Sequence, residues 1–129
     1  MAKCKCGSGK EYRACCQPYH RGKEAETPEA LLRSRYSAYA NHLADYIVRT
    51  THPASPYHPL VAKEIQQFCR ITTFEGLEIF VQNIQENEGW ITFTAHLKQG
   101  QKDISFTEKS YFTKVEGAWR YHSGSPGNA

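Results

Sequence analysis

The chain has 129 residues, of which 40% are hydrophobic and 22% are charged, and its formal net charge is +3. This length suits one domain with a small appendage, and the apolar content excludes an intrinsically disordered chain. A membrane-spanning helix needs about 18 or more consecutive apolar residues, and the sequence contains no such run. We therefore expect a globular protein that does not enter a membrane.

Four of the five cysteines crowd into the N-terminal end of the chain, as Cys4, Cys6, Cys15 and Cys16. Thiolates are soft ligands, and four of them complete the tetrahedral shell of Zn²⁺ with no position left for water. The run Gly7-Ser8-Gly9 follows the first pair and can form the tight turn that folds one pair onto the other. The spacing therefore predicts a structural zinc site rather than a catalytic one.

A disulfide scaffold is the main alternative for these cysteines. Met1-Ala2-Lys3 leads into the first cysteine without the apolar stretch of a secretory signal, so we expect a cytoplasmic, reducing environment. A bridge between the adjacent Cys15 and Cys16 would be strained, and no Cys-x-x-Cys redox pair is present. His20 is a substitute ligand should one thiol be displaced, although we expect it to be a surface histidine.

The segment Cys4–Cys16 resembles the SEC-C zinc motif, which is Cys-x-Cys, eight residues, and then Cys followed by Cys or His. All four ligand positions match, as do the Cys-Gly-Ser-Gly-Lys core and the aromatic residue at Tyr12. Lys5 stands where the motif usually has proline, which alters local stiffness but not ligation. The resemblance implies a zinc-binding unit over residues 1–22 that can contact a protein partner.

The charge is unevenly distributed along the chain. Residues 1–25 carry six Lys and Arg against two Glu, a net charge of +4, and the remaining residues carry −1. Four thiolates on one Zn²⁺ have a formal charge of about −2, which the nearby Lys and Arg side chains would offset. This end is then only mildly basic, so contact with RNA or the ribosome is a less favoured alternative.

The middle of the chain predicts helices. Residues 17–26 are polar and predict a linker. Thr27 followed by Pro28 is typical of a helix start, and apolar residues then recur at three- and four-residue spacing. Two shorter helices are predicted over residues 43–51 and 61–68, separated by a proline-rich crossing.

Beyond this point the apolar residues alternate with polar ones, which predicts β-strands. The expected strands cover residues 74–85, 90–98, 104–115 and 119–122. Their short, glycine-containing connections favour antiparallel hairpins, and the tail from Ser123 onward is expected to be frayed. Three helices followed by an antiparallel meander predict an α+β domain, with the helices covering one face of the sheet.

This order resembles the cone-shaped fold of nuclear transport factor 2 and ketosteroid isomerase, in which a curved antiparallel sheet packs on helices. Together with the SEC-C motif, four segments resemble the YchJ-like family of small bacterial proteins: Glu29–Tyr39, Thr51–Pro53, Glu108–Phe112 and Gly117–Tyr121. The resemblance implies a nuclear transport factor 2-like domain over residues 27–124. It implies no settled biochemical activity.

Alternation along the third strand places Glu108 on the same face as Phe106 and Phe112, so its carboxylate is expected to point inward. A carboxylate beneath apolar side chains must be paired, hydrogen-bonded or protonated. The candidate partners in a pocket under the sheet are Arg35, the hydroxyl of Tyr36 or Tyr39, and His52.

Two roles remain open for this carboxylate. An internal ion pair between Glu108 and Arg35 is favoured. The alternative is a small-molecule isomerase, dehydratase or hydrolase, with Glu108 as acid or base beside Tyr39 or His52. We expect His52 instead to cap the second helix, and Tyr121 to be an ordinary core or rim aromatic. The sequence favours a zinc-binding adaptor, or a module for a protein partner or small ligand, over an enzyme.

Overall fold

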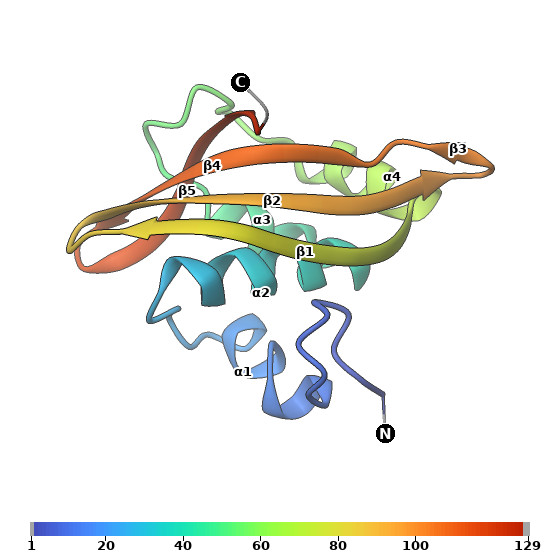
Figure 1. The fold of residues 1–129 in the computed structure, drawn as a ribbon, viewed down its shortest axis with the longest axis horizontal. Coiled ribbons are helices and arrows are strands. Elements are labelled where there is room, and N and C mark those ends of the chain that lie inside the picture. The colour runs from blue at the N-terminus through green and yellow to red at the C-terminus, as the bar shows by residue number, and fades with distance from the viewer. Residues whose placement is uncertain (1, 128–129) are drawn as a thin grey trace.

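The computed structural model describes residues 2–127, which form three layers (Figure 1). A curved antiparallel sheet is one layer, three helices cover one of its faces, and the N-terminal segment lies on the far side of these helices. The predicted α+β class, with a curved sheet on three helices and a small N-terminal appendage, is confirmed. No helix within this part of the chain is long and apolar enough to cross a membrane.

The N-terminal segment contains the 3-10 turn η1 (Tyr12–Ala14) and the one-turn helix α1 (Gln17–His20). The linker predicted over residues 17–26 is therefore wrong at its start. Pro18 lies in the first turn of α1, where a backbone N–H has no partner within the helix, so the N–H that proline lacks is not needed there. Tyr19 packs against the main core. The polar composition gave no sign of this short helix, because a single aromatic side chain, Tyr19, is enough to attach it to the core.

Three further helices cover the sheet, and their bounds are α2 (Pro28–Ala40), α3 (Ala44–Arg49) and α4 (Ala62–Ile71). The predicted start of α2 is confirmed, because Thr27 Oγ1 accepts a hydrogen bond from Ala30 N at 3.1 Å. Helix α3 is shorter than predicted and α4 is longer. All three predicted helices are present.

Helix α2 is buried on opposite sides. Leu31 and Tyr36 belong to the main hydrophobic core beneath the sheet. Ser34, Ser37 and Ala38 are completely buried against neighbouring segments on the other sides of the helix. These small side chains allow close approach, so α2 lies between the sheet and the N-terminal segment (Figure 1).

The sheet is antiparallel throughout, in the order β1-β2-β4-β5, with the short β3 paired to the end of β2. The strands are β1 (Thr73–Ile84), β2 (Glu88–Gln99), β3 (Lys102–Asp103), β4 (Phe106–Val115) and β5 (Ala118–Pro126). Alternate residues of β2 are buried under the helices, as the period-two pattern predicted. Shifts of register within β1 and between β4 and β5 add to the bend of the sheet around the helices.

The C-terminal tail is not frayed over Ser123–Pro126, where it was predicted to be, and the last two residues of that prediction, 128 and 129, lie outside the described residues. Strand β5 continues to Pro126, and its residues Ser123–Pro126 pair with Glu108–Tyr111 of β4. Strand β4 is long, so its backbone N–H and C=O groups need hydrogen-bond partners on β5 beyond Tyr121. Small residues on this edge strand can supply those partners. At its other end β5 is tied to α3, since Tyr121 N donates to Thr50 O at 2.9 Å.

Replacing Thr27 tests the start of α2. Thr27→Ala removes the acceptor for Ala30 N, so we expect the free energy of unfolding to fall by about 1 kcal/mol. Thr27→Ser keeps a hydroxyl and is expected to have a smaller effect. Urea denaturation followed by circular dichroism measures both variants, and equal losses would show that the cap is not the cause.

Candidate functional site

The structure brings the four N-terminal cysteines together. The Sγ atoms of Cys4, Cys6, Cys15 and Cys16 all lie within 4.8 Å of one another, and only Cys15 is not fully buried. Cys15 Sγ lies 3.6 Å from Cys6 Sγ and 3.9 Å from Cys16 Sγ. Zn–S bonds of about 2.3 Å at tetrahedral angles place two sulfurs roughly 3.8 Å apart. The donor set therefore fits a tetrahedral metal site, and all five cysteines are free of disulfides.

The loop between the cysteine pairs is shaped by two glycines. Gly7 and Gly9 have φ values of 83° and 85°, a region that glycine enters without strain. This turn places Ser8 Oγ 3.1 Å from Cys15 Sγ, where the hydroxyl can support a thiolate. Lys3 Nζ donates to the carbonyl of Gly9 at 2.9 Å, so one of the nearby cations also holds the loop.

The thiols of the cluster ionise unequally. A hydrogen bond from Cys16, followed by weaker ones from the loop, lowers the pKa of Cys6 to about 4 against the opposing effect of burial. The hydrogen bond to Cys6 and burial raise the pKa of Cys16, and burial raises the pKa of Cys15. Without a cation the cluster therefore favours a thiolate at Cys6, and thiolates at Cys15 and Cys16 require a bound positive charge to stabilise them.

The cysteine loop is attached to helix α2 by several hydrogen bonds. Arg33 Nη1 donates to the carbonyl of Cys6 at 2.9 Å, and Cys4 Sγ lies 3.6 Å from the buried Ser37 Oγ. These contacts join the cluster directly to the helix that supports the sheet.

His20 is part of this attachment and is not the surface histidine that we predicted. Its Nε2 lies 2.8 Å from the carbonyl of Ser34 on α2, and its Nδ1 lies 2.6 Å from the hydroxyl of Tyr12. The ring also packs edge-on against Tyr46 at 4.8 Å, and burial lowers its pKa. With both ring nitrogens engaged, His20 links the appendage to α2, and it is not among the clustered ligand atoms.

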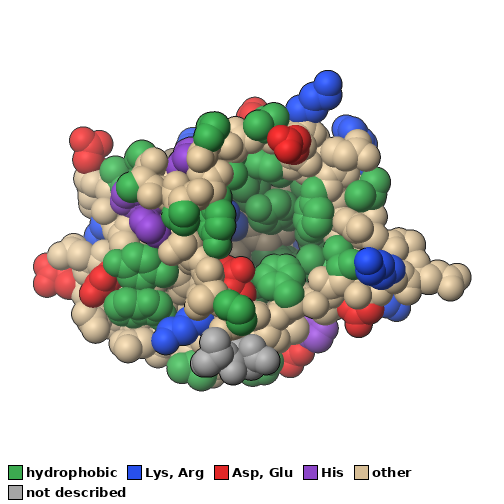
Figure 2. Space-filling view, turned by 90° about the horizontal axis from the view of Figure 1, so that it is seen from above, with side chains coloured by type: hydrophobic (Ala, Val, Ile, Leu, Met, Phe, Trp, Pro, Cys, Tyr) green, Lys and Arg blue, Asp and Glu red, His purple; other side chains and the backbone are tan. Residues whose placement is uncertain are grey.

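A cavity of about 450 Å³ is the second candidate site. It lies between the sheet and the helices, and Figure 2 shows a hollow surrounded by hydrophobic side chains. Most of its wall is aromatic or aliphatic, including Tyr36, Phe68, Phe74, Phe93, Leu97 and Phe106. The volume falls within the range of roughly 300–1,000 Å³ that small-molecule sites occupy.

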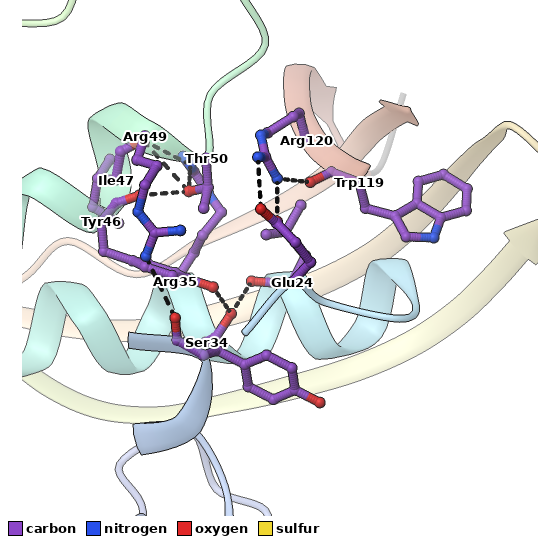
Figure 3. Close-up of polar contacts among 11 residues, drawn as sticks. Glu24, Ser34, Arg35, Tyr46, Ile47, Arg49, Thr50, Trp119 and Arg120 are labelled. Carbon is purple, nitrogen blue, oxygen red and sulfur yellow. Dashed lines mark hydrogen bonds and ion pairs between the residues drawn. The ribbon is translucent and has the colours of Figure 1, made fainter. Parts of the chain in front are cut away.

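Arg35 and Glu108 both line this cavity, but the predicted ion pair between them is wrong. No carboxylate among residues 2–127 lies within 4.0 Å of the Arg35 guanidinium. Its Nη1 donates instead to the carbonyl of Ile47 at 3.1 Å and to the hydroxyl of Thr50 at 2.8 Å (Figure 3). A third acceptor, Thr51 Oγ1, lies 3.1 Å away, so the last turn of α3 holds this side chain.

Tyr121 lies between the two charges. The Arg35 guanidinium carbon lies over the face of the Tyr121 ring, 4.6 Å from the ring centroid. The Tyr121 hydroxyl donates to Glu108 Oε2 at 3.1 Å. Ser110 Oγ donates to the same oxygen. Gly124 on β5 leaves the space that this carboxylate fills, because a Cβ there would collide with it. Glu108 does point inward, as strand alternation predicted, but its partners are Ser110 on its own strand β4 and Tyr121 on β5.

The other two predicted pocket residues, Tyr39 and His52, do not lie together in the cavity. Tyr39 lines the cavity, but its hydroxyl makes no hydrogen bond with Glu108. His52 is not among the cavity-lining residues, and its ring lies 5.2 Å from that of His122. It does not cap α3 either, because its Nδ1 accepts from Ala54 N in the following turn. The chain folds back at this turn, which directs the imidazole away from the cavity.

Tyr121, Thr50 and Thr51 were not expected to shape the site. Tyr121 was interpreted only as a core or rim aromatic, and no local pattern marks the two threonines. The one available signal is the pairing of Thr50-Thr51 at a predicted helix end, where hydroxyls often hydrogen-bond the backbone.

A curved antiparallel sheet over helices, with a cavity between them, defines a nuclear transport factor 2-like domain. Residues 27–124 match the family model described as YchJ, middle NTF2-like domain. The chain belongs to the YchJ-like family. A curated relative, UPF0225 protein YchJ of Shigella dysenteriae serotype 1 (strain Sd197), is 40% identical over 125 residues, which cover 95% of this chain and 82% of that protein.

Two solved structures are similar over nearly the whole chain. One is the solution structure of a SEC-C motif containing protein from Rhodopseudomonas palustris, with a TM-score of 0.86, 35% identity, and coverage of 95% of this chain and 97% of that one. The other is the crystal structure of a SEC-C motif containing protein from Psychrobacter arcticus, with a TM-score of 0.78, 30% identity, and coverage of 91% and 73%. The resemblance to SEC-C motif proteins is confirmed.

The hydroxyl of Tyr121 makes the stability of the cavity sensitive to alkaline pH. Burial, followed by the negative charge of Glu108, raises the pKa of Tyr121. A tyrosine with a raised pKa contributes stability that is present below the ordinary tyrosine pKa of about 10 and is lost as pH rises above it. We expect Tyr121→Phe to lower the free energy of unfolding at pH 7 by about 1–2 kcal/mol and to weaken its decline above about pH 10.

Urea denaturation of the wild type and of Tyr121→Phe, at pH 7 and at a pH above about 10, measures the free energies of unfolding that this comparison needs. An alkaline decline of equal steepness in the two proteins would contradict the assignment to Tyr121.

Proposed function

We propose that this protein is a cytoplasmic, zinc-stabilised module that binds a small, largely apolar molecule. The zinc is held by Cys4, Cys6, Cys15 and Cys16, and the ligand occupies the cavity of the cone-shaped domain. The observation that carries this proposal is the cavity itself, which combines apolar walls with a few fixed polar groups.

Zinc is the metal that best fits the donor set. Four thiolates with sulfur separations of 3.6 and 3.9 Å suit a tetrahedral ion without redox chemistry. Four protein ligands leave no open position, so the ion would act as a crosslink that stabilises the loop. The free cysteines agree with a reducing compartment.

Binding is favoured over catalysis. The acid–base group considered from the sequence needed Glu108 beside Tyr39 or His52. His52 lies outside the cavity wall, and Tyr39 does not contact the carboxylate. Glu108 is instead hydrogen-bonded to Ser110 and Tyr121, which fixes it as part of the wall.

Cys15→Ser tests the metal site. We expect purified wild-type protein to contain about one zinc per chain, and Cys15→Ser to retain less than about half of that, because an uncharged hydroxyl is a poor zinc ligand. Cys69→Ala is the matched control, since Cys69 is buried in α4 away from the cluster and its loss leaves the zinc content unchanged. Elemental analysis measures all three, and zinc-free wild type or full zinc in Cys15→Ser would refute the site.

A neutral fluorescent probe, N-phenyl-1-naphthylamine, tests the cavity. We expect saturable binding with a rise in emission, and Ala95→Phe is expected to weaken it by about tenfold or more, because the new ring fills the space that the probe needs. Ala95→Leu is a milder version, and circular dichroism establishes that each variant folds.

The matched control for the probe is Phe80→Ser. Phe80 is 56% exposed, so it offers the probe an apolar surface outside the cavity. If Phe80→Ser abolished binding while Ala95→Phe did not change it, the cavity would not be the binding site.

A further inference from the structure

Arg35 is a buried cation without an anionic partner. It is only 7% exposed, and no carboxylate among residues 2–127 pairs with it. Burying an unpaired charge is unfavourable, and desolvation lowers the pKa of this guanidinium. Hydroxyl and carbonyl oxygens and the face of Tyr121 hold the group, but none of these carries a neutralising charge.

Within residues 2–127, only one nitrogen of Arg35 donates hydrogen bonds. All three of its hydrogen bonds start from Nη1. Neither Nε nor Nη2 donates to any described group, yet neither is among the fully enclosed polar atoms, so both retain accessible surface. The open space that Arg35 lines is the cavity. Two N–H-bearing atoms of the fork are therefore available to a ligand.

Tyr39 supplies a further donor. It follows Arg35 by four residues, which places both side chains on the same face of α2, and it lines the same cavity. Its hydroxyl makes no hydrogen bond within the described part of the chain and is not fully enclosed. Arg35 and Tyr39 thus offer neighbouring donors on this side of the cavity.

We propose that the cavity binds a small monocarboxylic acid, with its carboxylate on Arg35 and Tyr39 and its aromatic or aliphatic tail along the apolar wall. This inference rests on the proposed ligand-binding function. A planar carboxylate matches the fork of a guanidinium and supplies the missing negative charge. Glu64 and Glu108 line the same cavity, so a dianionic phosphate head would meet stronger repulsion than a single carboxylate does.

The test compares two probes of similar size and shape that differ in charge, 4-phenylbutyrate and its neutral amide 4-phenylbutanamide. We expect the wild type to bind the acid about tenfold or more tightly than the amide, because only the acid forms a hydrogen-bonded ion pair with Arg35 in which both partners are charged. Isothermal titration calorimetry measures both affinities. The ¹⁵Nε resonance of Arg35 is expected to shift with the acid and not with the amide.

Three variants test whether Arg35 causes the preference for the charged acid over the neutral amide. Arg35→Met is expected to bind the acid and the amide equally, and Glu108→Gln is expected to bind the acid more tightly than the wild type does. Arg49→Met, a matched change outside the cavity wall, leaves the preference intact. If Arg35→Met does not fold, the wild-type preference and the Arg35 resonance decide the question.

The failures are distinguishable. Equal binding of acid and amide by the wild type overturns the carboxylate site and leaves the ligand-binding cavity standing. Binding of neither probe at millimolar concentration overturns the carboxylate site, and the ligand-binding cavity is overturned as well only if N-phenyl-1-naphthylamine also fails to bind. A preference for the acid that persists in folded Arg35→Met, or that leaves the Arg35 resonance unmoved, overturns the role of Arg35.

Discussion

Helix α2 is packed from opposite sides by two different units, and both candidate sites depend on that packing. One side carries Arg33 and Ser37, which contact the cysteine loop. Another carries Arg35 and Tyr39, which line the cavity. The cysteine loop and part of the cavity wall are therefore built on the same closely packed helix. The appendage is therefore integrated with the domain that carries it.

Two opposite charges in the cavity wall, those of Arg35 and Glu108, do not pair. Arg35 is fixed by the last turn of α3, and Glu108 is fixed by β4 and β5, with Tyr121 between them. Each group satisfies part of its hydrogen-bonding capacity with polar neighbours. A direct ion pair would have closed this space and neutralised both groups. Their separation leaves a polarised region within an otherwise apolar cavity.

The errors made from the sequence share one origin, which is that a local pattern does not reveal what a distant segment offers. The composition after Tyr121 indicates a frayed tail, but β4 provides a backbone edge that orders it. Tyr12 is the one partner of His20 that lies near it in sequence among the contacts described above, and the contacts on Ser34 and Tyr46 exist only after α2 and α3 have packed. The ion pair between Arg35 and Glu108 was plausible from residue types, although no sequence pattern could place Tyr121 between them.

The sequence by itself determined the features that arise from short-range chemistry. These include the four cysteines at metal-ligand spacing, the Thr27 cap of α2, and the alternation that turns Glu108 inward. Each depends on dihedral preferences and periodicities over a few residues. Only the tertiary structure decided which groups meet in the cavity and which, such as His52, are directed away from it. Those contacts depend on how the sheet bends around the helices, and that curvature is a property of the whole assembly of strands.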